Sequence, residues 1–250
     1  MLRLVAVVLA LAAAGCGGSQ SESNAPPPPT TNPVDPATAG TIAGRVTFEG
    51  TAPPGQPIRM DSDPNCARQS SGATEQQVMV GANGALQNVF VYVKDGLGTL
   101  RFPVPTVAAV LDQKGCVYTP RVLGVQVGQA MEIVNSDPTL HNVHAVPVSN
   151  REFNMGYPIQ GMKHTHTFST REVMVPFKCD VHGWMRAWVG VLDHPYYGVT
   201  AADGGFTFEG LPPGTYTVEA WHESLGTQSQ TVTIGASETK GDVAFVFTAT

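Results

Sequence analysis

Residues 177–189, with the sequence FKCDVHGWMRAWV, decide how the rest of the chain is interpreted. They place a thiol, an imidazole and a thioether in one short stretch, at Cys179, His182 and Met185. Thiolate and thioether sulfurs select soft metal ions, and imidazole binds several transition metals. The spacing Cys-x2-His-x2-Met therefore predicts a metal-binding loop.

A second imidazole comes from an upstream segment, residues 135–144, with the sequence NSDPTLHNVH. One thiolate, two imidazoles and a weak thioether form the ligand set of electron-transfer copper sites. We therefore expect one type 1 copper ion and the transfer of single electrons. The expected ligands are His141, Cys179, His182 and Met185.

The composition favours short strands and turns over helices, because the chain of 250 residues has 27 Gly, 20 Pro and few charged residues. The net charge of −6 gives no electrostatic footprint for nucleic acid. We also find no Gly-x-Ser-x-Gly and no His-Glu-x-x-His motif. The chain is therefore not expected to be an enzyme or to bind nucleic acid.

The first 15 residues have the features of a signal peptide, with Arg3 before an apolar run that is too short to span a bilayer. The sequence AAGC at residues 13–16 resembles a bacterial lipoprotein cleavage box, which implies lipidation of Cys16. An ordinary secretory signal with a chance cysteine is the alternative. We expect an extracytoplasmic, periplasmic-side location with a lipid anchor in a bacterial membrane. The resemblance to lipoproteins implies, through Gly17 after Cys16, the outer rather than the inner membrane in a Gram-negative cell.

Residues 16–39, which include the run Pro26 to Pro29, are predicted to be a disordered, Pro-rich tether. Two further cysteines, Cys66 and Cys116, are expected to form a disulfide, because an exported compartment is oxidising. Two buried free thiols are the alternative.

The rest of the chain is predicted to be all-β, because short apolar alternations are separated by turn residues. Residues 51–73, rich in Pro, Ser and Asp, are predicted to be mostly loop. Residues 77–80 and 85–94 flank a Gly-Ala-Asn-Gly turn and predict a hairpin. Further strands are expected at residues 41–48, 107–111, 121–127, 130–135, 141–147, 163–168, 171–176 and 188–192.

Residues 104–193 resemble the cupredoxins, and the short ligand loop is closest to that of amicyanin. The resemblance is carried by CVYTPRVLGVQVGQ at residues 116–129, by LHNVH at residues 140–144 and by the ligand loop itself. It implies a Greek-key sandwich with copper at one end, in which Asn142 helps to hold the thiolate loop. Gly183 stands where amicyanin-type loops have proline.

The family also implies that His182 is the ligand nearest solvent and the point where electrons leave. Trp184 and Trp188 are then expected to form an apolar rim on which redox partners, a donor and an acceptor protein, dock. Packing in the core is the alternative for both rings.

Residues 199–220, VTAADGGFTFEGLPPGTYTVEA, are similar to the carboxypeptidase regulatory-like, transthyretin-type sandwich. That family opens with a pattern that GTIAGRV at residues 40–46 fits. We therefore predict a discontinuous domain made of residues 40–98 and 196–250, with the cupredoxin domain at 104–193 inserted between them. The disulfide would then tie the host to the insert. The alternative is one cupredoxin over residues 40–192 followed by a small sandwich.

Two other functions stay open. The regulatory-like sandwich is a candidate for non-redox binding of a glycan or a protein, which fold likeness alone supports only weakly. The copper site could also serve delivery or storage. Five further histidines are expected to be structural or exposed, namely His144, His164, His166, His194 and His222.

Overall fold

The computed structural model describes residues 29–75 and 77–249, so the predicted signal peptide and the predicted lipidation site at Cys16 lie outside the described residues. Within the described part the chain forms sixteen strands and two short helical segments, which confirms the all-β prediction. None of the helices in this part is long and apolar enough to cross a membrane. The elements are β1 (Gly40–Glu49), α1 (Pro64–Gln69), η1 (Ala82–Gly84), β2 (Phe90–Asp95), β3 (Ala109–Lys114), β4 (Val117–Thr119), β5 (Val122–Gln126), β6 (Ala130–Asn135), β7 (His141–Ala145), β8 (Phe153–Tyr157), β9 (Lys163–Thr167), β10 (Glu172–Lys178), β11 (Arg186–Leu192), β12 (Tyr197–Val199), β13 (Gly205–Leu211), β14 (Gly214–His222), β15 (Gly226–Ile234) and β16 (Thr239–Thr248).

The two ends of the chain together build one sandwich, which we call the flanking sandwich (β1, β2 and β12 to β16). Its sheets have the strand orders β13-β1-β16 and β12-β2-β14-β15. Alternate residues of these strands, such as Ile42, Val91 and Phe208, point into a shared apolar core. β1 therefore depends on strands from the far end of the sequence for both of its neighbours.

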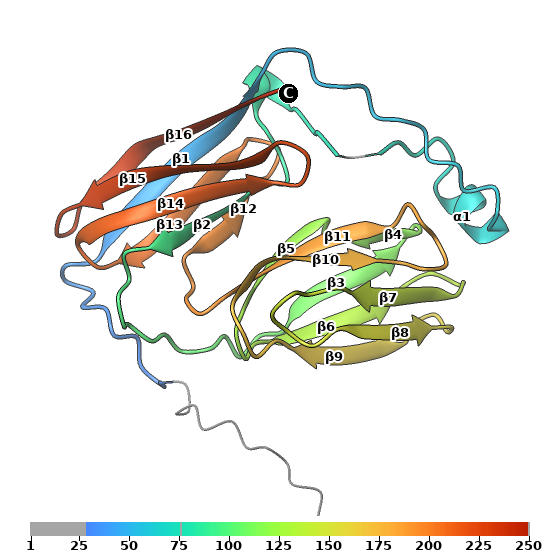
Figure 1. Ribbon diagram of the computed structural model, residues 1–250, viewed down its shortest axis with the longest axis horizontal. Coiled ribbons are helices and arrows are strands. Elements are labelled where there is room, and N and C mark those ends of the chain that lie inside the picture. The colour runs from blue at the N-terminus through green and yellow to red at the C-terminus, as the bar shows by residue number, and fades with distance from the viewer. Residues whose placement is uncertain (1–28, 76, 250) are drawn as a thin grey trace, which may run out of the picture.

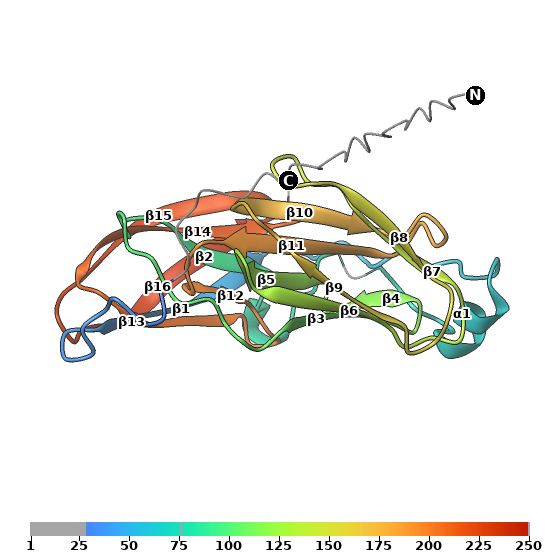
Figure 2. The ribbon, with the colours of Figure 1, turned by 90° about the horizontal axis from the view of Figure 1, so that it is seen from below.

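The strands β3 to β11 build a second sandwich, which we call the central sandwich (Figure 1). Its sheets have the orders β5-β11-β10-β7-β8 and β4-β3-β6-β9. Its core is separate from that of the flanking sandwich and contains Leu111, Ile133, Val143 and Phe177. Figure 2 shows the two sandwiches end to end along the long axis of the molecule.

The two sandwiches meet in a small apolar cluster around Phe90 of β2 and Leu192 of β11. Two paired glycines, Gly124 and Gly190, let the sheets approach closely there. A Cβ atom on Gly190 would lie 2.4 Å from the Phe90 ring, and one on Gly124 would lie 2.4 Å from the Tyr197 ring. The close contact between the two sandwiches therefore requires glycine at both positions.

A cap segment (residues 51–75) leaves the flanking sandwich after β1 and reaches the far end of the central sandwich, where it forms α1 (Figure 1). The Asp63 side chain accepts hydrogen bonds from the first backbone N–H groups of α1, and Pro64 opens the helix. A disulfide joins Cys66 of α1 to Cys116 of the central sandwich. The prediction of mostly loop holds for this segment apart from α1, but its position over the central sandwich was not predicted.

The predicted disordered tether, residues 16–39, includes residues that are packed against the flanking sandwich. Val34 is buried in the core of the flanking sandwich, and the Ser237 backbone N–H donates to the Thr38 carbonyl at 2.9 Å. Ordered packing therefore begins before residue 40, because one apolar side chain there finds a place in the core.

Candidate metal centre

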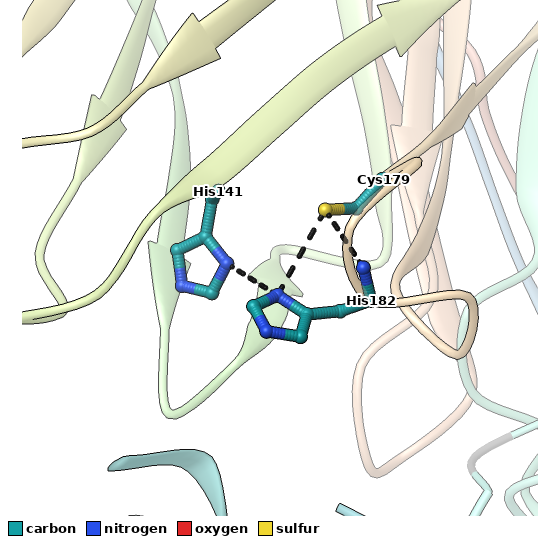
Figure 3. Close-up of side chains that lie close together, drawn as sticks. All are labelled: His141, Cys179 and His182. Carbon is teal, nitrogen blue, oxygen red and sulfur yellow. Dashed lines mark hydrogen bonds between the residues drawn. The ribbon is translucent and has the colours of Figure 1, made fainter. Parts of the chain in front are cut away.

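Two neighbouring strands bring the predicted ligands together. β7 begins at His141, and β10 ends one residue before Cys179. Because β7 and β10 pair antiparallel, both residues lie at the same end of the central sandwich. His182 comes from the turn that follows, and Figure 3 shows all three side chains pointing toward one another. The ligand atoms of His141, Cys179 and His182 lie within 4.8 Å of one another.

The cluster is closed to solvent. His141 is 0% exposed, and Cys179 and His182 are each 2% exposed. Cys179 is the free cysteine of the described residues. A buried thiol beside two buried imidazoles has little use in packing alone, since each polar atom removed from water needs a partner.

Met185 closes the same turn from its other side. Its backbone N–H donates to the His182 carbonyl at 2.9 Å, and its carbonyl accepts from the Cys179 N–H at 3.3 Å. The Met185 side chain is 1% exposed and packs in the apolar core that also contains Cys179. The turn therefore holds Met185 next to Cys179 and His182 in the fold.

The inner nitrogens of both imidazoles face the thiol. The Nδ1 atoms of His141 and His182 lie 2.9 Å apart, and Cys179 Sγ lies 3.9 Å from His182 Nδ1. The sulfur also accepts the backbone N–H groups of Asn142 at 3.5 Å and of His182 at 3.3 Å. These contacts favour the thiolate form of Cys179.

A carboxylate contacts the outer nitrogen of each ring. His141 Nε2 lies 2.9 Å from Asp137 Oδ2, and His182 Nε2 lies 3.2 Å from Asp63 Oδ2. A carboxylate accepts the Nε2 proton, which leaves the Nδ1 lone pair of the neutral ring directed inward. The arrangement thus presents a thiolate and two nitrogen lone pairs to one enclosed point.

The charges around the site follow from these contacts. Burial opposes protonation of His141, but the hydrogen bonds to Asp137 and Cys179 raise its pKa to about 9. Burial also opposes ionisation of the Cys179 thiol, yet hydrogen bonds from His141 and from backbone N–H groups lower its pKa. Each of these shifts therefore stabilises the charged form of its group, a protonated His141 ring and a Cys179 thiolate. A bound metal cation would favour the same thiolate and would compete with the proton on His141.

Asn142 braces the thiolate loop. Its side-chain oxygen accepts the backbone N–H of Asp180, the residue after Cys179, and its amide group contacts the Asp180 carboxylate. Tyr118 adds a second brace, because its hydroxyl donates to the backbone carbonyls of Asn142 and Lys178. The ends of β7 and β10 are therefore linked around the sulfur.

No expected ligand is more exposed than His182, but the ring is only 2% exposed because the cap segment covers it. Besides Asp63, Cys66 Sγ lies 3.7 Å from His182 Nε2. Asp63 is fixed in turn by the Thr139 hydroxyl, which donates to Oδ2 at 2.7 Å. The edge at which partners were expected to meet the ligand is occupied by the chain itself.

The two tryptophans of the expected docking rim have different places. The half-buried Trp184 ring packs on His182, with ring centroids 5.0 Å apart. Trp188 is not at the rim, because it lies in β11 and packs on Trp221 of the flanking sandwich with centroids 5.2 Å apart. Its Nε1 donates to Glu223 at 3.1 Å. Alternation along β11 directs Trp188 to the contact between the two sandwiches.

The remaining histidines lie outside the cluster. His144 contacts Asp180 and Glu152 through its two nitrogens. His164 and His166 belong to β9, and His166 packs between Phe153 and Phe168. His194 and His222 are buried in or beside the flanking sandwich. None of the five joins a group of metal-binding geometry among the described residues.

Asp63 and Asp137 are the site residues that the sequence analysis missed. Asp137 had a usable signal, since it lies in the segment quoted for His141 and follows a predicted strand. Its carboxylate accepts the backbone N–H groups of Gly115 and Cys116 at 2.8 and 2.7 Å. Asp63 had only the Asp-Pro signal of a helix start, which says nothing about a contact with His182.

Comparison with known proteins finds a family for one part of the chain. Residues 188–248 match the carboxypeptidase regulatory-like domain. The match covers β12 to β16 and the end of β11, whereas β1 and β2 lie outside it. No curated protein matches the chain.

Among solved structures the chain is similar to cupredoxins. The purple cupredoxin of Nitrosopumilus maritimus is 22% identical, with 33% of this chain and 98% of that chain covered and a TM-score of 0.29. A reduced variant of amicyanin is 28% identical, with 35% and 85% covered and a TM-score of 0.31. The copper-containing nitrite reductase of Thermus scotoductus is 19% identical, with 38% of this chain covered and a TM-score of 0.33. The chain spans 24% of the length of that reductase.

Fold and family match together define an all-β protein of two sandwiches. One carries a carboxypeptidase regulatory-like segment, and the chain has structural neighbours among the cupredoxins.

Proposed function

We propose that this chain binds one type 1 copper ion through His141, Cys179, His182 and Met185 and carries single electrons. The observation that carries the proposal is the enclosed convergence of Cys179 Sγ and two imidazole Nδ1 atoms, each ring contacted from behind by a carboxylate. Thiolate with imidazole disfavours a hard cation, and the thioether of Met185 favours copper over zinc, whose usual protein ligands are Cys, His and carboxylates.

The donors are held in place before any metal arrives. Strand pairing, the Asn142 brace and the two aspartates fix the ligand atoms from several sides. When bound, copper supplies a couple between two oxidation states that differ by one electron. A ligand set that cannot rearrange freely changes little between these states, which suits a carrier. With the site closed to solvent, we propose a carrier and not an enzyme.

We further propose that the chain works outside the cytoplasm, anchored through a lipid on Cys16, and exchanges electrons with redox partners. The Cys66–Cys116 disulfide supports this location, because disulfides persist in oxidising compartments. Burial of all three close donors favours retention of the ion over delivery to another protein.

We also propose that residues 40–98 and 196–250 form one discontinuous domain. β1 pairs with β13 and β16, and β2 pairs with β12 and β14. Each early strand thus finds its neighbours after the central sandwich.

Titration of the full chain with Cu(II), followed by absorption and EPR spectroscopy, tests the copper proposal. We expect intense visible thiolate-to-copper absorption with a narrow copper hyperfine pattern, lost in Cys179→Ser and in His141→Gln. His144→Gln is the matched control, because this residue lies on the same strand and outside the cluster. A pale spectrum in the unchanged chain would overturn the proposal.

A further inference from the structure

A cavity of about 550 Å³ opens beside the ligand loop. The cap segment forms one wall, and residues 183–186 of the ligand loop form another. Its volume lies within the roughly 300–1,000 Å³ of pockets that hold small molecules. Trp184 and Met185 line it, whereas His182 does not.

Contact with the outer edge of His182 is closed to any partner. Asp63, Thr139 and the Cys66–Cys116 disulfide occupy that side, and the ring is 2% exposed. Electrons exchanged through His182 must therefore cross another group.

Trp184 is placed to be that group. Trp184 lines the cavity, and its ring packs on His182 with centroids 5.0 Å apart. Its Nε1 donates to the Cys116 carbonyl at 2.9 Å, which fixes the ring. A residue that borders the cavity and whose ring packs on the His182 imidazole gives a shorter path than one through solvent.

The cavity wall carries positive charge in a chain whose net charge is −6. Lys114 and Arg186 line it, are exposed, and have no ion pair among the described residues. Arg121 also lines it but is paired with Glu223, and Glu75 is the acidic residue there. Such a local excess of positive charge attracts anions and raises their rate of encounter.

We propose that one of the two redox partners is a small anionic molecule held in this cavity, and that electrons pass between it and the site through Trp184 and His182. Each event moves one electron from the reduced molecule to the oxidised site, or back, with no bond formed or broken. This inference rests on the copper proposal for the path, whereas the anion cavity can be tested in the metal-free chain.

The first test uses the metal-free full chain and the fluorescence of Trp184, isolated as the difference from Trp184→Phe. The ratio of iodide to caesium quenching of this component should exceed the ratio for a free tryptophan derivative. Lys114→Gln with Arg186→Gln should remove the excess, while Lys163→Gln with Lys240→Gln, the same change of charge outside the cavity lining, should not. A ratio in the unchanged chain no higher than that of the free derivative would overturn the anion cavity.

The second test follows oxidation of the reduced, copper-loaded chain by stopped flow. Ferricyanide should react faster than the cation tris(phenanthroline)cobalt(III), after allowing for their self-exchange rates and potentials. Removing the two cavity charges should slow ferricyanide by about tenfold. Trp184→Leu should slow both oxidants, and Trp184→Phe should restore part of the rate.

The outcomes separate the two proposals. A chain without thiolate-to-copper absorption would overturn the copper proposal and the electron path, while the quenching test would still decide the cavity. If the chain shows that absorption, but Trp184→Leu and the variant without the two cavity charges are oxidised at unchanged rates, only the electron path through Trp184 is overturned.

Discussion

At the residue scale, Asp63 and Asp137 give the two imidazoles one orientation. The outer nitrogens face carboxylates, and the inner nitrogens face Cys179. Asp137 is 1% exposed at its side chain and Asp63 is 16% exposed, so water does not replace either contact freely. The pKa of Asp63 is lowered to about 2, because hydrogen bonds from Thr139 and the backbone of α1 outweigh its burial.

A buried histidine far from the cluster gives a pH prediction. Burial of His194 lowers its pKa to about 4, and its Nε2 donates to the Val93 carbonyl at 2.9 Å. The unfolded chain takes up a proton near pH 6.5, while the folded chain does not until near pH 4. Stability is therefore lost as pH falls through this window. At pH 5 the loss is about 2 kcal/mol.

Urea unfolding of the metal-free chain at pH 7 and pH 5 measures this loss. His194→Gln, whose amide can still donate to Val93, should lose about 2 kcal/mol less than the unchanged chain between the two pH values. Comparing the two chains removes the contributions of all other titrating groups. If the free energies of unfolding of the two chains changed equally between pH 7 and pH 5, the prediction would be contradicted. Above pH 7.5, equal changes in the two chains are expected.

The proximity of Cys179 and His182 could be predicted from sequence, because two positions separate them in one loop and such a spacing limits their distance in space. The Asp63–His182 contact could not, since 119 positions separate the two residues. Nothing in the composition of residues 51–73 distinguishes a free loop from a cap. The cover over His182 could not be predicted for the same reason, because the resemblance includes the central sandwich and not the segment that closes it.

At the element scale, short apolar alternations predicted most central strands to within a few residues. β6 was predicted with its observed bounds, Ala130–Asn135. The hairpin expected around residues 81–84 is reduced to a bridge between Val80 and Leu86, with a short helical turn between them. β8 was missed, because its burial pattern mixes half-buried and exposed residues until Tyr157. Alternation of apolar and polar residues indicates a strand only where one face of that strand is clearly buried.

The contact between β11 and β2 gives a stability prediction. Gly190→Ala would place a Cβ atom 2.4 Å from the ring of Phe90. That ring is fully buried and packs on Tyr197 and Tyr92, so it cannot move aside. Overpacking of this kind should lower the free energy of unfolding by about 1–3 kcal/mol.

Urea unfolding compares Gly190→Ala with Gly156→Ala. Gly156 is also a strand residue, but a Cβ atom there would have no neighbour within 4 Å. The control should therefore unfold close to the unchanged chain. Equal stability of the two variants would show that the sheets do not meet closely at Gly190.

At the scale of the whole molecule, the arrangement of the flanking sandwich predicts the effect of a truncation. A chain ending at residue 195 lacks β12 to β16, so β1 loses both neighbouring strands and β2 loses both of its own. Amide hydrogen exchange, read by mass spectrometry, should become fast in β1 and β2 and stay slow in β3 to β11. Retained protection of β1 and β2 would favour the alternative of one cupredoxin over residues 40–192.

The sequence suggested this discontinuity through GTIAGRV at residues 40–46, a pattern expected before the segment that follows the central sandwich. The contact between the sandwiches had no such signal. It rests on Gly124 and Gly190, whose role is visible only once Tyr197 and Phe90 are seen against them. Glycine within a strand indicates a close approach in general, but not what approaches.

The parallel pairing of β1 with β16 also bears on how the chain folds. The Ser237 hydroxyl donates to the Ala37 carbonyl across 200 positions, and the β1–β16 ladder closes a loop of similar length. Closing so long a loop in an unfolded chain costs entropy before any contact compensates for it, and pairings of this kind slow folding. The central sandwich, whose strands pair over shorter distances, is expected to fold first. Its collapse brings the ends of β2 and β12 together and shortens the effective loop, so the flanking sandwich should fold last, after β16 has left the ribosome.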